Sequence, residues 1–315
     1  MTYLSCSIPA FTVTDQELIE MSKKLRDVDD NKVEHRQFRL NYQGQASSNP
    51  KVDNAKESLF SYVDPKLFNK TSYSQFMSLT DNFYRKTKKA EPRVSTEEET
   101  REIKAFLDTV LKSKPWQELY KFLKEKNHPF TAKGESTFYD WIDQLWFKHY
   151  SRSKGLVLDS SGFEHVFIGE EKHGEVAGLH NWLRIYTLER NATENFDYKG
   201  YIVTRGEVMA TVKFTWNGIV KKSGSVMFGT SPEFDMALFT LCFLSRHGRQ
   251  CKVELDACPL SITNFDIVQN GKVHLTIISS SPLIIFKNTF TLQVYIGTTY
   301  PTAGKLTEQC KRLHG

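Results

Sequence analysis

The hydrophobic pattern changes its period near residue 156, and this change constrains the fold more than any other feature. Before that point apolar residues recur every three or four positions, as on the buried face of a helix. After it they alternate with polar residues, as along a half-buried strand. The chain has 315 residues, of which 39% are hydrophobic, enough for one large core or two modest ones. We therefore predict an α+β fold, with a helical N-terminal lobe over residues 1–155 and a C-terminal lobe of antiparallel sheets with a few helices over 156–315.

The first half contains the clearest helices. Apolar residues repeat with helical spacing over residues 15–26 and again over 138–145. Ser95 and Glu98 form a capping box ahead of a third apolar helical pattern. Pro115 is suited to the first turn of a fourth helix. The apolar stripes of these helices are predicted to form core rather than a binding surface.

The second half alternates with a period of two. This alternation predicts strands over residues 208–216, 273–277 and 292–296. Two helices are predicted to interrupt the strands, one over residues 178–189 and one after the turn at Ser231. No internal sequence repeat is visible.

The cysteine count argues against a disulfide framework. The five cysteines are an odd number and include no Cys-x-x-Cys pair, so we expect free thiols and no cysteine-rich zinc site. The start of the chain lacks the basic and apolar regions of a signal peptide. No stretch approaches the roughly 18 apolar residues of a membrane span. A cytoplasmic location without membrane contact is therefore favoured, with secretion as the alternative.

Two of the nine histidines lie in unusual sequence surroundings. His165 alternates with Phe163 and Phe167, so on a strand the three side chains would share one face. His180 follows Gly178 closely, where a helix is predicted to begin and a side chain can project into a cleft. Histidine can accept or donate a proton near neutral pH because its ordinary pKa is about 6.5. Taken alone, either histidine is more typical of a structural role.

Two later segments add a cation and an aromatic ring. Lys221 and Lys222 lie in a glycine-containing segment, and Tyr300 follows Thr299 at the end of a predicted strand. A fixed ammonium stabilises negative charge that develops on a phosphoryl group, and a tyrosine can pack against a base or a sugar. The 42 basic residues exceed the 37 acidic ones by five, a mild excess that permits an RNA partner without requiring one. None of these features is specific by itself.

Together and in this order, the segments resemble the signature of the EndoU family of uridylate-specific endoribonucleases, which includes placental protein 11-like animal members. The two histidine segments of that family resemble GFEHVFIGE and GLHNW, and its lysine segment resembles WNGIVKKSGSVMFGTSPEFDMALFTLCFL. Its tyrosine segment resembles GTTYP. The resemblance is dense over residues 160–301 and looser over the helical half. It implies that residues 156–315 form an EndoU-like catalytic region.

The resemblance implies a role for each candidate site residue. His180 matches the general base of the family, His165 the general acid, and Lys221 the lysine beside the phosphate, with Lys222 as the neighbouring alternative. Acidic positions beside the first histidine, which support it, match Glu164 and Glu170. Substrate-binding positions match Ser225, Thr299 and Tyr300.

The implied reaction is cleavage of single-stranded RNA at uridines. The base removes the proton of the ribose 2′-hydroxyl, which attacks the adjacent phosphorus, and the acid protonates the 5′-oxygen that leaves. The products carry 2′,3′-cyclic phosphate ends, and DNA, which lacks the attacking hydroxyl, is expected to resist cleavage. The resemblance also implies activation by Mn²⁺ or Ca²⁺, without identifying ligands. We expect a monomer.

Two other classes of function stay open. A zinc hydrolase would bind its metal through His165, His180 and either Glu170 or His173, and would leave the lysine and serine without a role. A non-catalytic RNA-binding protein of the same fold would bind RNA without cutting it. A thiol nucleophile at Cys242 is disfavoured because this cysteine lies in an apolar predicted helix, which is typical of core.

Overall fold

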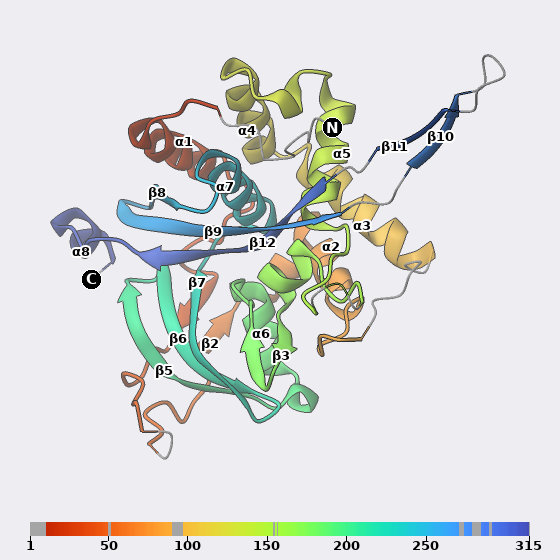
Figure 1. Cartoon of the computed structure of the whole chain (residues 1–315). Helices are drawn as coiled ribbons and strands as arrows, with labels where there is room; N and C mark the ends of the chain where they lie inside the picture. Colours follow the sequence, from red (N-terminus) through yellow and green to blue (C-terminus); the bar gives the residue numbers. More distant parts are fainter. Residues whose placement is uncertain are drawn as a thin grey trace.

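The α+β prediction is confirmed by the structure, a computed structural model in which helices dominate the N-terminal half and antiparallel strands the C-terminal half (Figure 1). The capping box at Ser95 and the first residue of the 273–277 strand lie outside the described residues. The structure describes residues 11–49, 52–89, 97–153, 155, 157–270, 274–278, 285–289 and 292–314.

The helices of the first half follow from local sequence signals. At the start of α1 (Asp15–Asp27) the Thr14 hydroxyl accepts from the backbone N–H of Glu17, and the Glu17 carboxylate accepts from the backbone N–H of Thr14. This reciprocal capping satisfies two donors that the helix itself cannot bond. Pro115 lies in the first turn of its helix, as predicted. The other helices here are α2 (Thr71–Ser78), α3 (Glu97–Val110), α4 (Lys114–Glu125) and α5 (Glu135–Trp146).

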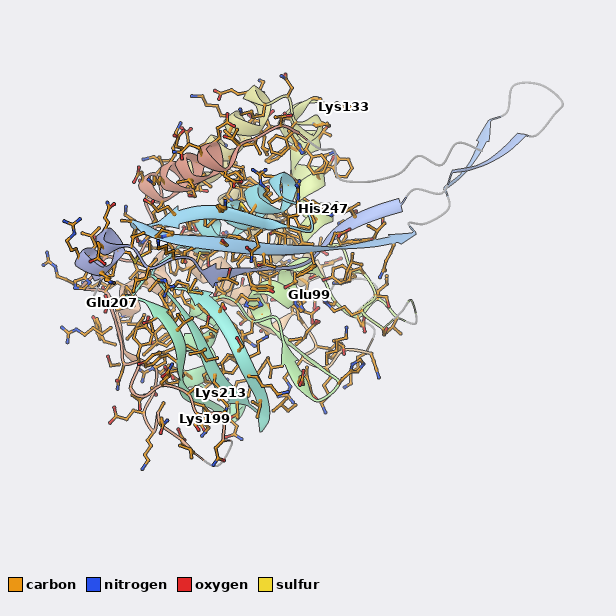
Figure 2. All side chains as sticks on the ribbon, turned by 60° about the vertical axis from the view of Figure 1, so that its left-hand side comes forward. Glu99, Lys133, Lys199, Glu207, Lys213 and His247 are labelled. Atoms are coloured by element: carbon orange, nitrogen blue, oxygen red, sulfur yellow. A yellow bond between two sulfur atoms is a disulfide. The ribbon has the colours of Figure 1, made fainter. Side chains whose placement is uncertain are left out.

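The second half contains two three-stranded antiparallel sheets. One has the order β5–β6–β7, and the other has the order β12–β9–β8. The strands are β5 (Phe196–Arg205), β6 (Met209–Trp216), β7 (Ile219–Met227), β8 (Gln250–Leu255), β9 (Cys258–Asn270) and β12 (Leu292–Ala303). Shorter pairs are β1 (Phe38–Leu40) with β2 (Phe60–Val63), β3 (Glu170–Lys172) with β4 (Glu175–Ala177), and β10 (His274–Ile278) with β11 (Ile285–Thr289). The β10–β11 hairpin extends away from the rest of the molecule (Figures 1 and 2).

The centre of the fold is α7 (Pro232–Ser245), which the sequence predicts after Ser231. The Ser231 hydroxyl accepts from the backbone N–H of Phe234 and caps the helix. All 14 residues of α7 are buried, because the helix packs against α1, α2 and α4 on one side and against β8, β9 and β12 on the other. Each fully buried large apolar side chain contributes about 1.5–3 kcal/mol. The core therefore includes side chains from both halves, and the boundary between lobes at residue 155 stays a prediction.

Two lysines attach a long loop to the β5–β6–β7 sheet. Lys213 donates to the carbonyl oxygen of Ser47 (2.9 Å), and Lys199 pairs with Asp53 (2.7 Å). Figure 2 labels both lysines at one end of this sheet. Gly200 has φ +103° and lies so close to the loop that an added Cβ would overlap the carbonyl oxygen of Gly44. The loop from the helical half is thus held against the sheet of the second half.

The expectation of free thiols was wrong for four of the five cysteines. Disulfides join Cys242 to Cys251 and Cys258 to Cys310, which are 9 and 52 residues apart in the sequence. An odd count excludes complete pairing but not two pairs, and only the packed fold brings Cys258 beside Cys310. The second bond attaches α8 (Glu308–His314) to the start of β9. The cysteines therefore no longer count in favour of the cytoplasmic location expected from the sequence.

Alkylation of the denatured protein tests these two disulfides. Without reductant we expect one labelled cysteine, Cys6, and with reductant all five, measured by intact mass. Cys310→Ser should lower the free energy of unfolding by about 2–4 kcal/mol, because it opens a long loop. Cys6→Ser, which changes a cysteine outside the two disulfides, is the control and should leave both disulfides intact. Five labels before reduction would restore the prediction of free thiols.

Candidate active site

His165 lies in a single π-helical turn, Glu164–Ile168, and not on a strand, the case considered from the alternation of Phe163, His165 and Phe167. The turn is closed by a hydrogen bond from the N–H of Gly169 to the carbonyl oxygen of Glu164 (2.8 Å). Phe163 and Phe167 both enter the core, because their spacing of four also places them together on a helical turn. His165 keeps 7% of its surface exposed and lines a cavity. π-Helical turns are frequent at functional sites.

The second histidine segment pairs with this turn through the main chain. The N–H of Leu179 donates to the carbonyl oxygen of His165 (3.0 Å), and the N–H of His180 donates to that of Val166 (2.7 Å). Gly178 permits this approach: it has φ +66°, and an added Cβ would overlap the His165 carbonyl oxygen. The histidine segments are therefore in direct backbone contact, just before α6 (Trp182–Arg190) begins.

A carboxylate and a guanidinium orient His165. Its Nδ1 lies 2.6 Å from Oε1 of Glu170, which is also 2.9 Å from Nε of Arg152. An ionised carboxylate only accepts, so Nδ1 carries the imidazole proton and Nε2 is left as an acceptor. Burial, followed by the charge of Arg152, lowers the pKa of His165 to about 4 against the opposing effect of Glu170. His165 is therefore neutral at pH 7 in the free protein.

His180 is held by a different partner. Its Nδ1 lies 3.0 Å from the carbonyl oxygen of Ser225, which fixes the proton on Nδ1 and leaves Nε2 as an acceptor. The ring stacks on Tyr300, with centroids 5.0 Å apart and planes inclined by 23°. Burial, followed by the ammonium of Lys221, holds the pKa of His180 well below its usual range. This imidazole is thus neutral and can take up a proton.

The structure separates the two neighbouring lysines. Lys221 lines the same cavity as the histidines, and burial lowers its pKa to about 8. Lys222 points outward with 79% of its side chain exposed, and pairs with Glu175 at 2.9 Å. Of these two neighbouring lysines, Lys221 is therefore the one placed to act on a ligand bound between the histidines.

The cavity has a volume of about 570 Å³ and is bordered by the β3–β4 hairpin, β7, β9 and β12. Ser225 contributes to its wall, and its hydroxyl lies 2.9 Å from that of Thr211. Thr299 does not reach the cavity: it is fully buried and donates to Asn264 (2.8 Å). Successive residues of a strand face opposite ways, so Thr298 and Tyr300 line the cavity instead.

Several residues of the site were missed by the sequence reasoning. Thr298 could have been inferred, because strand alternation places its side chain on the same face as that of Tyr300. Phe265, 51% exposed at the cavity on the paired strand β9, is opposite Thr298 only through the sheet register. Arg152 gives no sequence signal, because it precedes β3 by 18 positions. Glu164, predicted to support His165, is fully buried within the π-helical turn.

The described residues offer no resident metal site. Among them, no group of three or more His, Cys, Asp or Glu side chains is placed to hold a metal ion. The zinc site of the hydrolase hypothesis, made of His165, His180 and either Glu170 or His173, is therefore not formed. In the same part of the chain, no such cluster fits a bound Mn²⁺ or Ca²⁺. None of the helices in the described part of the chain has the length and apolar content that a bilayer crossing requires.

The fold and the cavity define an α+β protein in which two buried histidines and a lysine line one cavity. The family model described as Endoribonuclease XendoU matches residues 17–280. A Bos taurus protein named uridylate-specific endoribonuclease is 38% identical over 273 residues, which are 84% of this chain. A Danio rerio protein named uridylate-specific endoribonuclease B is 35% identical over 264 residues, which are 80% of this chain and 92% of that protein. The chain spans 64% of the length of the bovine relative, less than two thirds.

A solved structure agrees with the sequence relatives. The structure of XendoU, a splicing-independent snoRNA-processing endoribonuclease, has a TM-score of 0.72 and 31% identity, and the alignment covers 93% of this chain and 99% of that one. The chain belongs to the XendoU family of endoribonucleases. The resemblance predicted from the histidine, lysine and tyrosine segments is therefore confirmed.

Alanine substitution at two glycines tests the contact between the histidine segments. Gly174, at the tip of the β3–β4 hairpin, has φ +76° and open space around it, so Gly174→Ala should cost only the left-handed backbone strain of about 1–2 kcal/mol. Gly178→Ala adds a backbone clash and should cost about 3 kcal/mol or more. Denaturant unfolding measures both. Equal losses would contradict the close approach at Gly178.

Proposed function

We propose that the chain is an endoribonuclease that cleaves single-stranded RNA at uridines by transphosphorylation and leaves 2′,3′-cyclic phosphate ends. The observation that carries the proposal is one cavity in which His165 and His180 both have Nδ1 occupied and Nε2 available, beside the ammonium of Lys221. Membership in the XendoU family and the names of the relatives support an RNA substrate. DNA is not cleaved in this scheme, because it lacks the attacking hydroxyl.

His180 is the general base. Its imidazole is neutral because burial lowers its pKa, and the bond from Nδ1 to the Ser225 carbonyl keeps Nε2 directed away from that strand. Nε2 removes the proton of the ribose 2′-hydroxyl as the oxygen attacks phosphorus. Stacking on Tyr300 holds the ring in place. Positioned proton transfer of this kind contributes about 10²–10⁴-fold to a rate.

His165 is the general acid. In the free protein it is neutral, with a pKa of about 4, so it must gain a proton when substrate binds. A bound phosphodiester brings negative charge next to the imidazole and favours its protonated form. Glu170 at 2.6 Å stabilises the same form. The protonated Nε2 then donates to the 5′-oxygen as the phosphorus–oxygen bond breaks.

Lys221 stabilises the charge that builds on the non-bridging oxygens. Its partial burial strengthens this interaction, because the surroundings screen the charge less than water does. Ser225 and Tyr300 are the proposed contacts to the uracil and the sugar, since the serine hydroxyl can hydrogen-bond one pyrimidine edge. Thr299 is left out of this set because it is turned toward Asn264.

The family resemblance is the basis for proposing that Mn²⁺ or Ca²⁺ activates the enzyme. In this scheme the ion takes no part in proton transfer or in bond cleavage. The protein acts as a monomer in this scheme. The proposed uridine specificity rests on the names of the relatives, and Ser225 is its proposed contact.

Cleavage of an oligonucleotide containing one uridine tests the proposal. The wild type, in EDTA, Mn²⁺ or Ca²⁺, should cut 3′ of the uridine and leave a cyclic phosphate. His165→Ala and His180→Ala should each lose at least about 10²-fold in rate with RNA affinity largely retained. Activity that requires the added ion would support the proposed activation. Binding without cleavage under every condition would instead indicate a non-catalytic RNA-binding protein.

The two lysines provide a matched pair. Lys221→Gln should lower kcat by about 10²-fold, because the charge that it removes stabilises the transition state. Lys222→Gln removes the same charge one residue away and should change kcat by less than about twofold, since its exposed pair with Glu175 is worth little. Single-turnover kinetics measure both. A larger effect at Lys222 would reverse the assignment.

Ser225→Ala tests the uridine contact. We expect the preference for uridine over cytidine to fall by about tenfold or more while the rate at uridine falls less, because a lost hydrogen bond removes discrimination of about 1–3 kcal/mol. Ser223→Ala, at the rim of the same cavity, is the control. Competitive cleavage of mixed oligonucleotides measures the preference, and an unchanged profile in Ser225→Ala would refute the role.

A further inference from the structure

A second cavity, of about 370 Å³, contains two arginines placed around a tryptophan. The guanidinium carbons of Arg85 and Arg184 lie 5.6 and 5.7 Å from the ring centroid of Trp216. The indole is 2% exposed, and its Nε1 donates to Glu194 (2.8 Å). The ring is thus fixed, and both guanidinium groups lie against it.

The positive charge of Arg184 is only partly balanced. In the described part of the chain, its side chain donates a single hydrogen bond, from Nε to the carbonyl oxygen of Ile168 at 3.4 Å. Burial lowers its pKa to about 10 despite the opposing charges of Glu194 and Asp81. Glu194 is already engaged by the indole, and Asp81 is exposed. A guanidinium has five N–H donors, so most of those of Arg184 remain for a ligand.

Arg85 adds a second guanidinium to the same cavity. Its Nε lies 3.6 Å from Glu171, beyond hydrogen-bond distance, and this buried nitrogen has no hydrogen-bond partner among the described residues. The charges that face the cavity are therefore two arginines, Asp81 and Glu194, with Glu171 behind Arg85. Paired guanidinium groups bind the oxygens of a phosphate with a geometry that suits their planar donors.

This cavity and the candidate active site share structural elements. Glu170, which contacts His165, and Glu171, which faces Arg85, are consecutive in β3 and point to opposite faces. In the β6–β7 register Lys221 is opposite Phe214, two residues from Trp216. The two positions are therefore about 7 Å apart along β6, at 3.3–3.4 Å per residue. Lys221 and Trp216 are therefore near neighbours in the β5–β6–β7 sheet.

We propose that Arg85, Arg184 and Trp216 form a second anion site, which binds a phosphodiester of the RNA strand outside the cleaved nucleotide. The site rests on the proposed ribonuclease function and deepens it, because it assigns a preference for substrates longer than a dinucleotide. It contributes to binding of the strand and takes no part in proton transfer.

Affinity for an uncleavable RNA tests the site. The probe is a short RNA in which the single uridine is replaced by 2′-deoxyuridine, so that it binds without reacting. Arg184→Gln and Arg85→Gln, on different elements, should each weaken binding by about tenfold and reduce the slope of log Kd against log salt by about one. Arg190→Gln is the matched control: it removes the same charge at the exposed end of α6 and should change neither quantity.

Cleavage of a uridine-containing dinucleotide separates this inference from the proposed function. A dinucleotide has a single phosphodiester, the one that is cleaved, and so offers no second phosphodiester to this site; both variants should therefore cleave it at the wild-type rate. Equal affinity losses in Arg184→Gln and Arg190→Gln, or no loss in either cavity variant, would overturn the second site while leaving dinucleotide cleavage intact. Failure of the wild type to cleave or bind either substrate would overturn both proposals.

A free phosphate ion has the same kind of oxygens as an RNA phosphodiester and could bind the two arginines instead. Thermal unfolding in the presence of inorganic phosphate distinguishes these two ligands. Stabilisation of the wild type but not of Arg184→Gln, together with unchanged RNA affinity, would assign the cavity to a free anion and overturn the RNA contact. Loss of RNA affinity without a phosphate effect supports the proposal.

Discussion

Two main-chain hydrogen bonds between the histidine segments are the interaction on which the candidate active site depends. They join Leu179 to His165 and His180 to Val166, and they form only because Gly178 has no Cβ. Through them the π-helical turn, which is fixed by the burial of Phe163 and Phe167, sets the place of His180. The positions of His165 and His180 relative to each other are thus set by backbone contacts, which vary less than side-chain contacts do.

Burial is the second constraint, and it gives the site its electrostatic character. It lowers the pKa values of His165, His180 and Lys221, so in the free cavity these two imidazoles are neutral and the Lys221 ammonium gives up its proton more readily than usual. A bound phosphodiester reverses part of this effect, because negative charge favours the protonated forms. Substrate binding and the charging of His165 are then coupled in the proposed mechanism, with Glu170 and Arg152 fixing the ring throughout.

The surrounding fold brings these groups together from distant parts of the chain. Arg152 from the end of the helical half also donates to the carbonyl oxygen of Gly297, so it links β12 to the carboxylate that orients His165. β12 in turn carries Tyr300 onto His180. The buried helix α7 supports the sheet from behind, and its disulfide from Cys242 to Cys251 connects it to β8. The site is therefore a product of the whole core rather than of one motif.

The amino-acid sequence alone determined the α+β class, several helices and the identity of the family. The class and the helices follow from local interactions, since hydrophobic periodicity and caps such as Thr14 act over a few residues. The family follows from sequence motifs such as GFEHVFIGE, which can be recognised without a structure. It also singled out His165, His180 and Lys221, which line one cavity, and left Lys222 as the alternative to Lys221. Tertiary structure decided that Lys221, and not Lys222, lines the cavity. It also decided the π-helical turn at His165, the burial of the Thr299 side chain against Asn264, the two disulfides, and the positions of Arg152 and Phe265. Each of these depends on sheet register or on contacts between residues far apart in the sequence, where local pattern carries no information.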